Sequence, residues 1–414
     1  MCPLAKYPVL GSIFKPFRRS QQKTLALIVS AIAEAGTCAA LALAAHIAAQ
    51  RDVQITSALR QLQRVLANPR IRMYALTVSM LRLLAQGAAQ PGRAHRREDG
   101  PHNNARLLDR LLIALDWTEW GTEEKSLLVA AAIVGARAIP VRAAAYFGAS
   151  ELALSRNARE NCFVARLVRA IRDAGTRTIL LGDRGFRRVS LLAHLQRLEQ
   201  PFVVRLAKNV WVELDRAGAA DTTVGSAGSA GSARGISGCL REQPLAPGMA
   251  LDLGRVQVRK DRAVELRVVG VWATGQKEPW WLVTNLFDAS LEDLAALYDR
   301  RMGVEEQFRD INGCRFGAQL KWTQIQTPRY LSRLLLLVGV AAMLWTAVGV
   351  AITAERPTAQ ARVKGRGARL SLLKLGIYFL TALRRRRRLG IRFIQHHLPP
   401  PQLRLFPWLR VAPS

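Results

Sequence analysis

The sequence has few acidic residues and no organised set of cysteines or histidines. Its 414 residues include 30 Asp and Glu against 61 Lys and Arg, which gives a formal net charge of +31. A surplus of this size needs a negatively charged partner. Nucleic acid is the leading candidate, and a membrane surface is the lesser one. The five cysteines are scattered and never form a Cys-x-x-Cys pair, and the six histidines show no metal-ligand spacing. A disulfide framework or a zinc ribbon is therefore not expected.

The beginning of the chain has no apolar segment followed by a small-residue cleavage site, so no secretory signal is expected. Residues 334–353 form one uncharged run of 20 residues, which is long enough to span a membrane. We interpret this run as a core helix, because it is single and a large domain needs at least one helix buried on all sides. The prediction is a cytoplasmic protein without a membrane partner.

The first part of the chain is predicted to be helical. Within residues 54–70, apolar residues recur at helical spacing while arginines occupy the other positions. Short helices that end in a basic helix are compatible with a helix-turn-helix module, although any small helical bundle gives the same pattern. Residues 87–105 are rich in Gly, Pro and charge, as in a linker.

Beyond this linker the pattern changes to short apolar runs that alternate with amphipathic segments. The order is strand, two strands, helix, strand, helix, strand, which predicts an α/β fold: a mixed sheet with helices on its faces. Short strand-like runs then fill residues 208–285, and two helical segments and a basic tail follow. The expected organisation is a helical, candidate DNA-binding region (1–86), a linker (87–105), a catalytic core (106–207), a β-strand insertion (208–285), the rest of the core with the buried helix (286–356), and a basic C-terminal region (357–414).

Three acidic residues stand out. Asp116 and Asp183 each end an apolar run, and an Asp at a strand end points into the crevice where α/β folds place their chemistry. Glu305 shares a predicted helical stripe with Tyr298 and Arg301, where an ordinary amphipathic helix would carry aliphatic residues. An Asp that opens a turn and a salt-bridged surface helix are the plain alternatives. Together, however, three carboxylates on two strands and a helix can hold two divalent cations for phosphoryl substitution.

These residues carry a resemblance to a known family. Asp116 in "ALDWT", Asp183 in "GDRGF" and the spacing Tyr298–x2–Arg301–x3–Glu305 resemble the DDE transposases of bacterial insertion sequences, in particular the insertion-sequence-four family with its Tyr-Arg-Glu-Lys signature. The similarity runs over roughly residues 55–380. It implies a ribonuclease-H-like core, a β-strand insertion between the second Asp and the Glu, and two Mg²⁺ (or Mn²⁺) ions held by the three acids.

One position departs from the family pattern. The signature ends with a Lys seven residues after the Glu, and this chain has Asn312 there, with Arg309 and Arg315 nearby as substitutes. We predict that Tyr298, Arg301, Arg309 and Arg184 contact DNA.

The resemblance implies a transposase that cleaves DNA at terminal inverted repeats and transfers the strand to target DNA, as a homodimer in the DNA complex. Three alternatives stay open at this level. One is a nuclease of the same fold that does not transpose. Another is a non-catalytic DNA-binding regulator of transposition. The last is a membrane protein built on residues 334–353.

Overall fold

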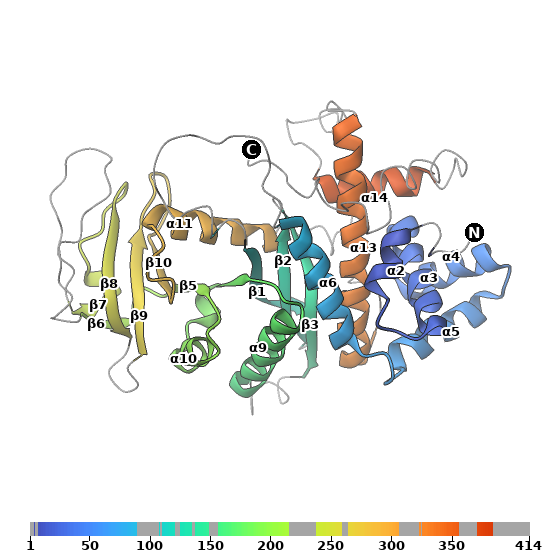
Figure 1. Cartoon of the computed structure of the whole chain (residues 1–414), viewed down its shortest axis with the longest axis horizontal. Helices are drawn as coiled ribbons and strands as arrows, with labels where there is room; N and C mark the ends of the chain where they lie inside the picture. Colours follow the sequence, from blue (N-terminus) through green and yellow to red (C-terminus); the bar gives the residue numbers. More distant parts are fainter. Residues whose placement is uncertain are drawn as a thin grey trace. The chain divides into compact units, whose positions relative to one another are not determined.

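The computed structural model describes residues 4, 7–88, 107, 110–120, 125–134, 137–148, 156–214, 237–258, 264–305, 323, 325–355 and 371–383. Contacts between residues divide the chain into two compact units. Unit 1 comprises Met1–Arg96, Trp117–Thr176 and Met302–Ser414, and unit 2 comprises Arg97–Asp116 and Arg177–Arg301. Figure 1 labels the helices and strands of both. The six-part organisation expected from the sequence stays a prediction.

The N-terminal part of unit 1 is helical, as the sequence predicts. Its helices are α2 (Pro8–Ile13), α3 (Arg19–Ala35), α4 (Ala40–Arg51), α5 (Ile55–Ala67) and α6 (Met73–Ala88). A bend of 107° separates α3 from α4. Gly36 makes this bend with a left-handed backbone (φ 65°), a conformation that glycine adopts without steric cost.

The apolar run of the sequence forms the centre of unit 1. It lies in α13 (Pro328–Glu355), which packs against α3, α14 (Leu372–Leu383) and strand β3 (Arg137–Phe147) (Figure 1). Among the described residues, α13 is the one helix that is long and apolar enough to cross a membrane; the bent pair α3 and α4 would count as a second span if taken together. The apolar window of α13 is 94% buried inside the protein, as in the core helix that the sequence predicts.

A β-hairpin and one further helix complete unit 1. Strand β2 (Lys125–Val134) pairs antiparallel with β3, and their register shifts between Ala130 and Ala131. Pro140 lies opposite Ala131, and proline cannot donate a hydrogen bond to the ladder, which explains an irregularity at this point. The helix predicted after the two strands is α9 (Arg156–Asp173).

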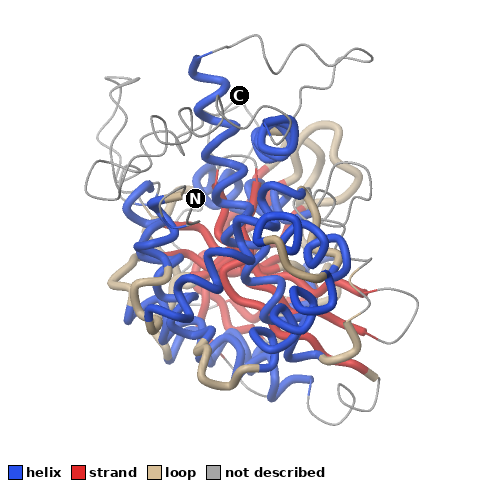
Figure 2. Tube along the Cα trace, turned by 90° about the vertical axis from the view of Figure 1, so that its right-hand side faces the viewer, coloured by secondary structure: helices blue, strands red, loops and turns tan. Residues whose placement is uncertain are grey.

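Unit 2 contains a mixed sheet whose strands lie side by side (red in Figure 2). Strand β1 (Leu111–Trp120) pairs parallel with β4 (Thr178–Gly182), and β4 pairs parallel with β5 (Phe202–Leu206). From β5 the sheet continues antiparallel through β10 (Trp280–Thr284), β9 (Val264–Val271), β8 (Ala250–Val258), β6 (Trp211–Leu214) and β7 (Gly238–Cys239). The predicted mixed α/β sheet is confirmed, and the strand-rich region 208–285 extends the same sheet through the pairing of β10 with β5.

Short helical segments lie between or after the strands of unit 2. They are η1 (Arg184–Phe186), α10 (Val189–Arg197), η3 (Leu240–Glu242), α11 (Leu291–Asp299) and η4 (Arg300–Met302). The strand-then-helix order around β4 and β5 matches the order predicted from the sequence.

Candidate active site

The register of the sheet places Asp116 and Asp183 next to each other. The parallel ladder between β1 and β4 ends with the pair Leu115 and Gly182, and each Asp is the next residue of its strand segment. One prediction needs correction, because Asp116 does not end its strand. Strand β1 continues to Trp120, since aromatic and β-branched residues follow Asp116. Asp116 is the first residue of β1 beyond its ladder with β4.

Asp183 is held by its own backbone turn. It is the N-cap of η1, and its Oδ1 accepts a hydrogen bond of 2.8 Å from the backbone N–H of Gly185. Its other carboxylate oxygen, Oδ2, faces Arg301, and the side chain is 40% exposed. The hydrogen bond from Gly185 therefore fixes the orientation of the carboxylate.

Arg301 lies between the two aspartates. Its Nη2 is 2.8 Å from Oδ1 of Asp116 and 3.5 Å from Oδ2 of Asp183. The exposed fraction is 6% for the Arg301 side chain and 14% for that of Asp116. Both carboxylates thus face the same buried positive charge, which compensates part of the cost of holding two anions close together.

The segment that carries Arg301 differs from the predicted helix. The stripe Tyr298–Arg301–Glu305 was expected on one continuous α-helix. Instead α11 ends at Asp299 and the chain tightens into the 3-10 turn η4 before helical residues resume at 303–305. A 3-10 turn has three residues per turn, so it changes the direction of each following side chain relative to an α-helix. Arg301 is therefore positioned by a local irregularity that the sequence spacing did not reveal.

Tyr298 is buried in unit 2. Its ring contacts the Trp280 ring edge-on, with centroids 5.1 Å apart. Burial raises the pKa of the Tyr298 phenol, and the negative charge of Asp183 raises it further, although Arg301 and Arg205 oppose the shift. The phenol therefore stays protonated at neutral pH and can act as a hydrogen-bond donor.

Glu305 lies in unit 1, is exposed and is helical. Within the described part of the chain, no three side chains of His, Cys, Asp or Glu gather closely enough to hold a metal ion. The structure brings Asp116 and Asp183 together through the strand register and Arg301. The role of Glu305 as a third ligand stays a prediction. Arg309, Asn312 and Arg315 lie outside the described residues.

The donor set fits a hard divalent cation. Mg²⁺ prefers carboxylate oxygens, and it is usually bound through one or two carboxylates together with water and substrate phosphate. Asp116 and Asp183 supply two such groups, and a guanidinium already occupies the space that they share. The residues present could therefore hold an ion of this type at this place.

A basic pocket of about 340 Å³ adjoins Arg184, the residue after Asp183. Nη2 of Arg184 and Nη2 of Arg205 lie 2.7 and 2.8 Å from the same carboxylate oxygen of Glu278. The charged residues lining the pocket are Arg184, Arg205, Lys208, Arg241, Lys277 and Glu278. Our sequence interpretation identified only Arg184 among them. The others come from β5, the turn after it, η3 and the segment before β10, and no spacing in the sequence connects them.

Comparison with known protein families is consistent with this geometry. A family model described as a transposase DDE domain matches residues 108–326, which is more than half of the chain. The comparison with curated proteins finds no match.

Proposed function

The chain belongs to the family of transposase DDE domain proteins, and we propose that it cleaves DNA at the terminal inverted repeats of an insertion sequence and joins the released 3′-hydroxyl to target DNA. The observation that carries the proposal is the arrangement of Asp116 and Asp183 around one positive charge. The resemblance to the insertion-sequence-four family in the Tyr298–Arg301–Glu305 spacing supports it.

In this proposal Asp116 and Asp183 hold divalent cations, with Glu305 as the third ligand. Two Mg²⁺ or Mn²⁺ ions would stabilise the attacking and leaving oxygens of an in-line displacement at phosphorus. The protein then supplies no covalent nucleophile. The hydrogen bond from Gly185 orients Asp183, and the strand register sets its separation from Asp116.

Arg301 has two roles in the proposal. The single positive charge of its guanidinium compensates part of the negative charge of the two carboxylates. If the carboxylates held cations, like charges would repel and Arg301 would turn toward the DNA phosphate, in keeping with its place in the signature. The remaining DNA contacts of the site are assigned to Tyr298, Arg184 and Arg309.

The charge of the chain supports DNA as the partner. The net charge of +31 favours contact with phosphates, and the basic pocket beside Arg184 concentrates cations near Asp183. A dimer in the DNA complex and a site of action at the bacterial nucleoid belong to the same proposal.

The test uses the full chain and a plasmid that carries the gene with its flanking DNA. Asp116→Asn, Asp183→Asn and Glu305→Gln should each abolish Mg²⁺-dependent strand cleavage and leave DNA binding within about threefold, because the variants remove the metal clamp and not the phosphate contacts. Asp288→Asn is the matched control, since Asp288 is exposed in unit 2. Normal cleavage by Asp116→Asn or Asp183→Asn would refute the assignment of that residue.

The same assay separates a transposase from a nuclease. A transposase forms a strand-transfer product in which the 3′-hydroxyl of the element is joined to target DNA. Cleavage without any joined product would leave a nuclease of the same family. Binding without cleavage by the parent protein would indicate a regulator.

A further inference from the structure

Helix α9 of unit 1 carries a dense row of arginines. It contains five arginines, two acidic residues and no lysine. Arg166, Arg169 and Arg172 are exposed on one side of the helix. Arg159 and Cys162 precede Arg166 by seven and four residues, so they lie on the same side. We call these five residues the α9 face. Six apolar residues of α9 are buried: Phe163, Val164, Leu167, Val168, Ala170 and Ile171.

Both acidic residues of α9 make contacts within unit 1. Glu160 is 2% exposed and accepts a hydrogen bond of 2.8 Å from the indole N–H of Trp117. At the other end of the helix, the side chain of Asp173 accepts from the hydroxyl of Tyr74, and its carbonyl oxygen accepts from Arg82 at 2.8 Å. These contacts attach the two ends of α9 to Trp117 and to α6. The arginines therefore project from a rigid support.

Aromatic rings lie beneath two arginines of this region. The guanidinium of Arg159 lies over the ring of Tyr146, 5.1 Å from its centroid. The guanidinium of Arg142, in the neighbouring strand β3, lies over the ring of Phe163 at 4.9 Å. Stacking uses the flat face of a guanidinium and directs its N–H groups outward. Both arginines are thereby oriented for bidentate contact with a phosphate.

Three arginines of this region form no ion pair with an Asp or Glu among the residues that the structure describes: Arg142, Arg166 and Arg169. Nε of Arg142 is buried, and it has no hydrogen-bond partner in the described part of the chain. Burial lowers the pKa of the Arg142 guanidinium, and the positive charge of Arg166 lowers it further. An anion bound between Arg142 and Arg166 would offset this repulsion.

The length of the α9 face suits an extended anion. Arg159 and Arg172 are 13 residues apart, which corresponds to about 20 Å along the helix axis. Each strand of duplex DNA carries one phosphate per about 3.4 Å of its axis, so a face of this length passes about six phosphates of one strand. A small anion would meet only one pair of these arginines, whereas a DNA backbone meets them all.

The side chains between the arginines favour DNA over a membrane surface. Helices that lie on a membrane bury large apolar side chains in it. The positions between the arginines of α9 hold Cys162 and Ala165 instead, and the large apolar side chains of the helix are buried inside unit 1. Arginine contacts to phosphate carry no sequence information. The face is therefore suited to a duplex of any sequence.

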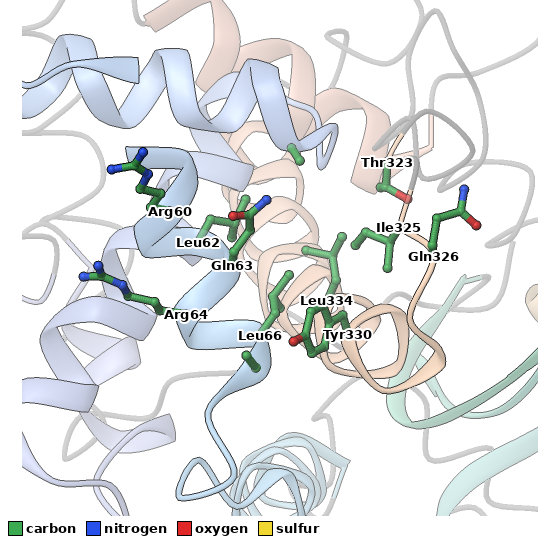
Figure 3. Close-up of a pocket in the computed structure, with 12 residues that line it drawn as sticks. Arg60, Leu62, Gln63, Arg64, Leu66, Thr323, Ile325, Gln326, Tyr330 and Leu334 are labelled. Atoms are coloured by element: carbon green, nitrogen blue, oxygen red, sulfur yellow. The ribbon is translucent and has the colours of Figure 1, made fainter. Parts of the chain in front are cut away.

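The arginines of α5 lie in a different setting. Arg60 and Arg64 extend from α5 beside a cavity of about 570 Å³, with Leu66 on another side of the helix (Figure 3). Tyr330 lines another part of this cavity. Arg64 is thus an exposed arginine of the same unit that lies beside a cavity and outside the α9 face.

We infer that the α9 face, together with Arg142, binds the phosphate backbone of duplex DNA without regard to sequence. Within the proposed function, such a surface suits target DNA, whose sequence differs from that of the element's ends. The assignment to target DNA rests on the proposed function, whereas binding of the backbone does not.

The first test measures the affinity of the full-length protein for two unrelated duplexes of equal length, without divalent metal, over a series of salt concentrations. Joint replacement by Arg166→Ala and Arg169→Ala should lower the slope of log affinity against log salt by about 1.8, because each lost phosphate contact removes about 0.9. Both duplexes should lose affinity by the same factor. Arg166→Lys with Arg169→Lys keeps the two charges and should keep the parent's slope, which separates lost contacts from a folding defect.

Arg64→Ala is the matched control for the single variant Arg166→Ala. Arg166→Ala should lower the slope by about 0.9, and Arg64→Ala should leave it unchanged. Equal changes in the two variants would mean that affinity follows the total charge of the chain, and this result would overturn the inference.

The second test uses Cys162 as a probe, because its thiol is exposed in the middle of the α9 face. An uncharged alkylating reagent should modify Cys162 more slowly when an unrelated duplex is bound, as measured by peptide mass spectrometry. The variant with Arg166→Ala and Arg169→Ala should lose this protection. An unchanged rate in the parent protein at saturating DNA would overturn the inference. So would binding of phosphatidylserine–phosphatidylcholine vesicles, and not of DNA, through the same arginines.

Both tests are independent of the cleavage assay because they need no divalent metal. Failure of the α9 face would leave Asp116 and Asp183 as catalytic residues. Conversely, protection of Cys162 by DNA in a protein that cleaves no strand would refute the proposed function and keep the α9 face as a DNA-binding surface.

Discussion

Two regions of the molecule bury different kinds of group. Neutral groups surround α13, whereas the Asp116–Asp183–Arg301 cluster holds charged side chains. Around α13 in unit 1, neutral groups approach so closely that glycine is required. A Cβ atom on Gly376 would overlap the carbonyl oxygen of Trp345, and one on Gly349 would overlap that of Leu372. In unit 2, the cluster places two anions and one cation in a confined space. The first region derives its stability from packing density, whereas the second gives up stability for a charge arrangement that suits its chemistry.

The largest effect on stability is expected from a methyl group between α13 and α14. Gly376→Ala forces the two helices apart because its Cβ would meet backbone atoms, and overpacking of this severity costs about 3 kcal/mol or more in the free energy of unfolding. Chemical denaturation measures it. Gly11→Ala in α2 is the control, because nothing lies within 4 Å of its added Cβ, and it should be neutral or stabilising. Equal stability of the two variants would contradict the close packing of α13.

Arg301→Met is expected to lower the free energy of unfolding by less than Gly376→Ala, and to change the response of the melting temperature to Mn²⁺. Removal of the guanidinium takes away the positive charge that both carboxylates face. The expected cost is about 1–3 kcal/mol, less than for a fully buried pair because the Asp183 side chain is 40% exposed. Mn²⁺ should then raise the melting temperature of this variant more than that of the parent protein, whereas Gly376→Ala should show the parent's response.

Arg197→Met is the control for this comparison, since Arg197 is an exposed arginine of α10 in the same unit. Its melting temperature should respond to Mn²⁺ as the parent's does. An identical Mn²⁺ response in the Arg301→Met variant would mean that the guanidinium and the metal do not share the site.

The smallest effect on stability is expected from a polar contact between α6 and α9. The hydroxyl of Tyr74 donates to Asp173 at 2.6 Å, and Tyr74→Phe should cost about 0.5–1 kcal/mol at neutral pH. Burial raises the pKa of the Tyr74 phenol above its ordinary value of 10.0, and the hydrogen bond to Asp173 raises it further. The folded protein therefore favours the protonated phenol, and this stabilisation is lost as the pH rises from 10 through the folded-state pKa. The free energy of unfolding, measured at pH 7 and above pH 10, should differ less between the parent and the variant at the higher pH. A difference that stays constant would contradict the prediction.

The sequence predicted much of both regions because their signals are local. An uncharged run of 20 residues predicted a core helix, and α13 is buried as expected. Apolar runs that end at Asp116 and Asp183 predicted strands, and the motifs around them predicted the transposase family that the family model confirms.

What the sequence could not show depends on three-dimensional contacts. Arg301 was assigned to DNA phosphate because its position in the signature suggests a cation, but spacing alone does not show which charge it meets. The 3-10 turn at η4 redirects Arg301, and although Gly303 follows this turn directly, a single Gly inside a helical pattern does not by itself predict a 3-10 turn. Similarly, strand β1 continues beyond Asp116 because Trp117 and Thr118 favour a strand. The prediction that the strand ends at Asp116 was therefore wrong.

The most direct measurement is anomalous diffraction from crystals of the full-length protein soaked in Mn²⁺. The account predicts Mn²⁺ density bound by Asp116 and Asp183, with the Arg301 guanidinium withdrawn from both carboxylates. Mn²⁺ bound elsewhere, or an unmoved Arg301 that still contacts both aspartates in the soaked crystal, would contradict it.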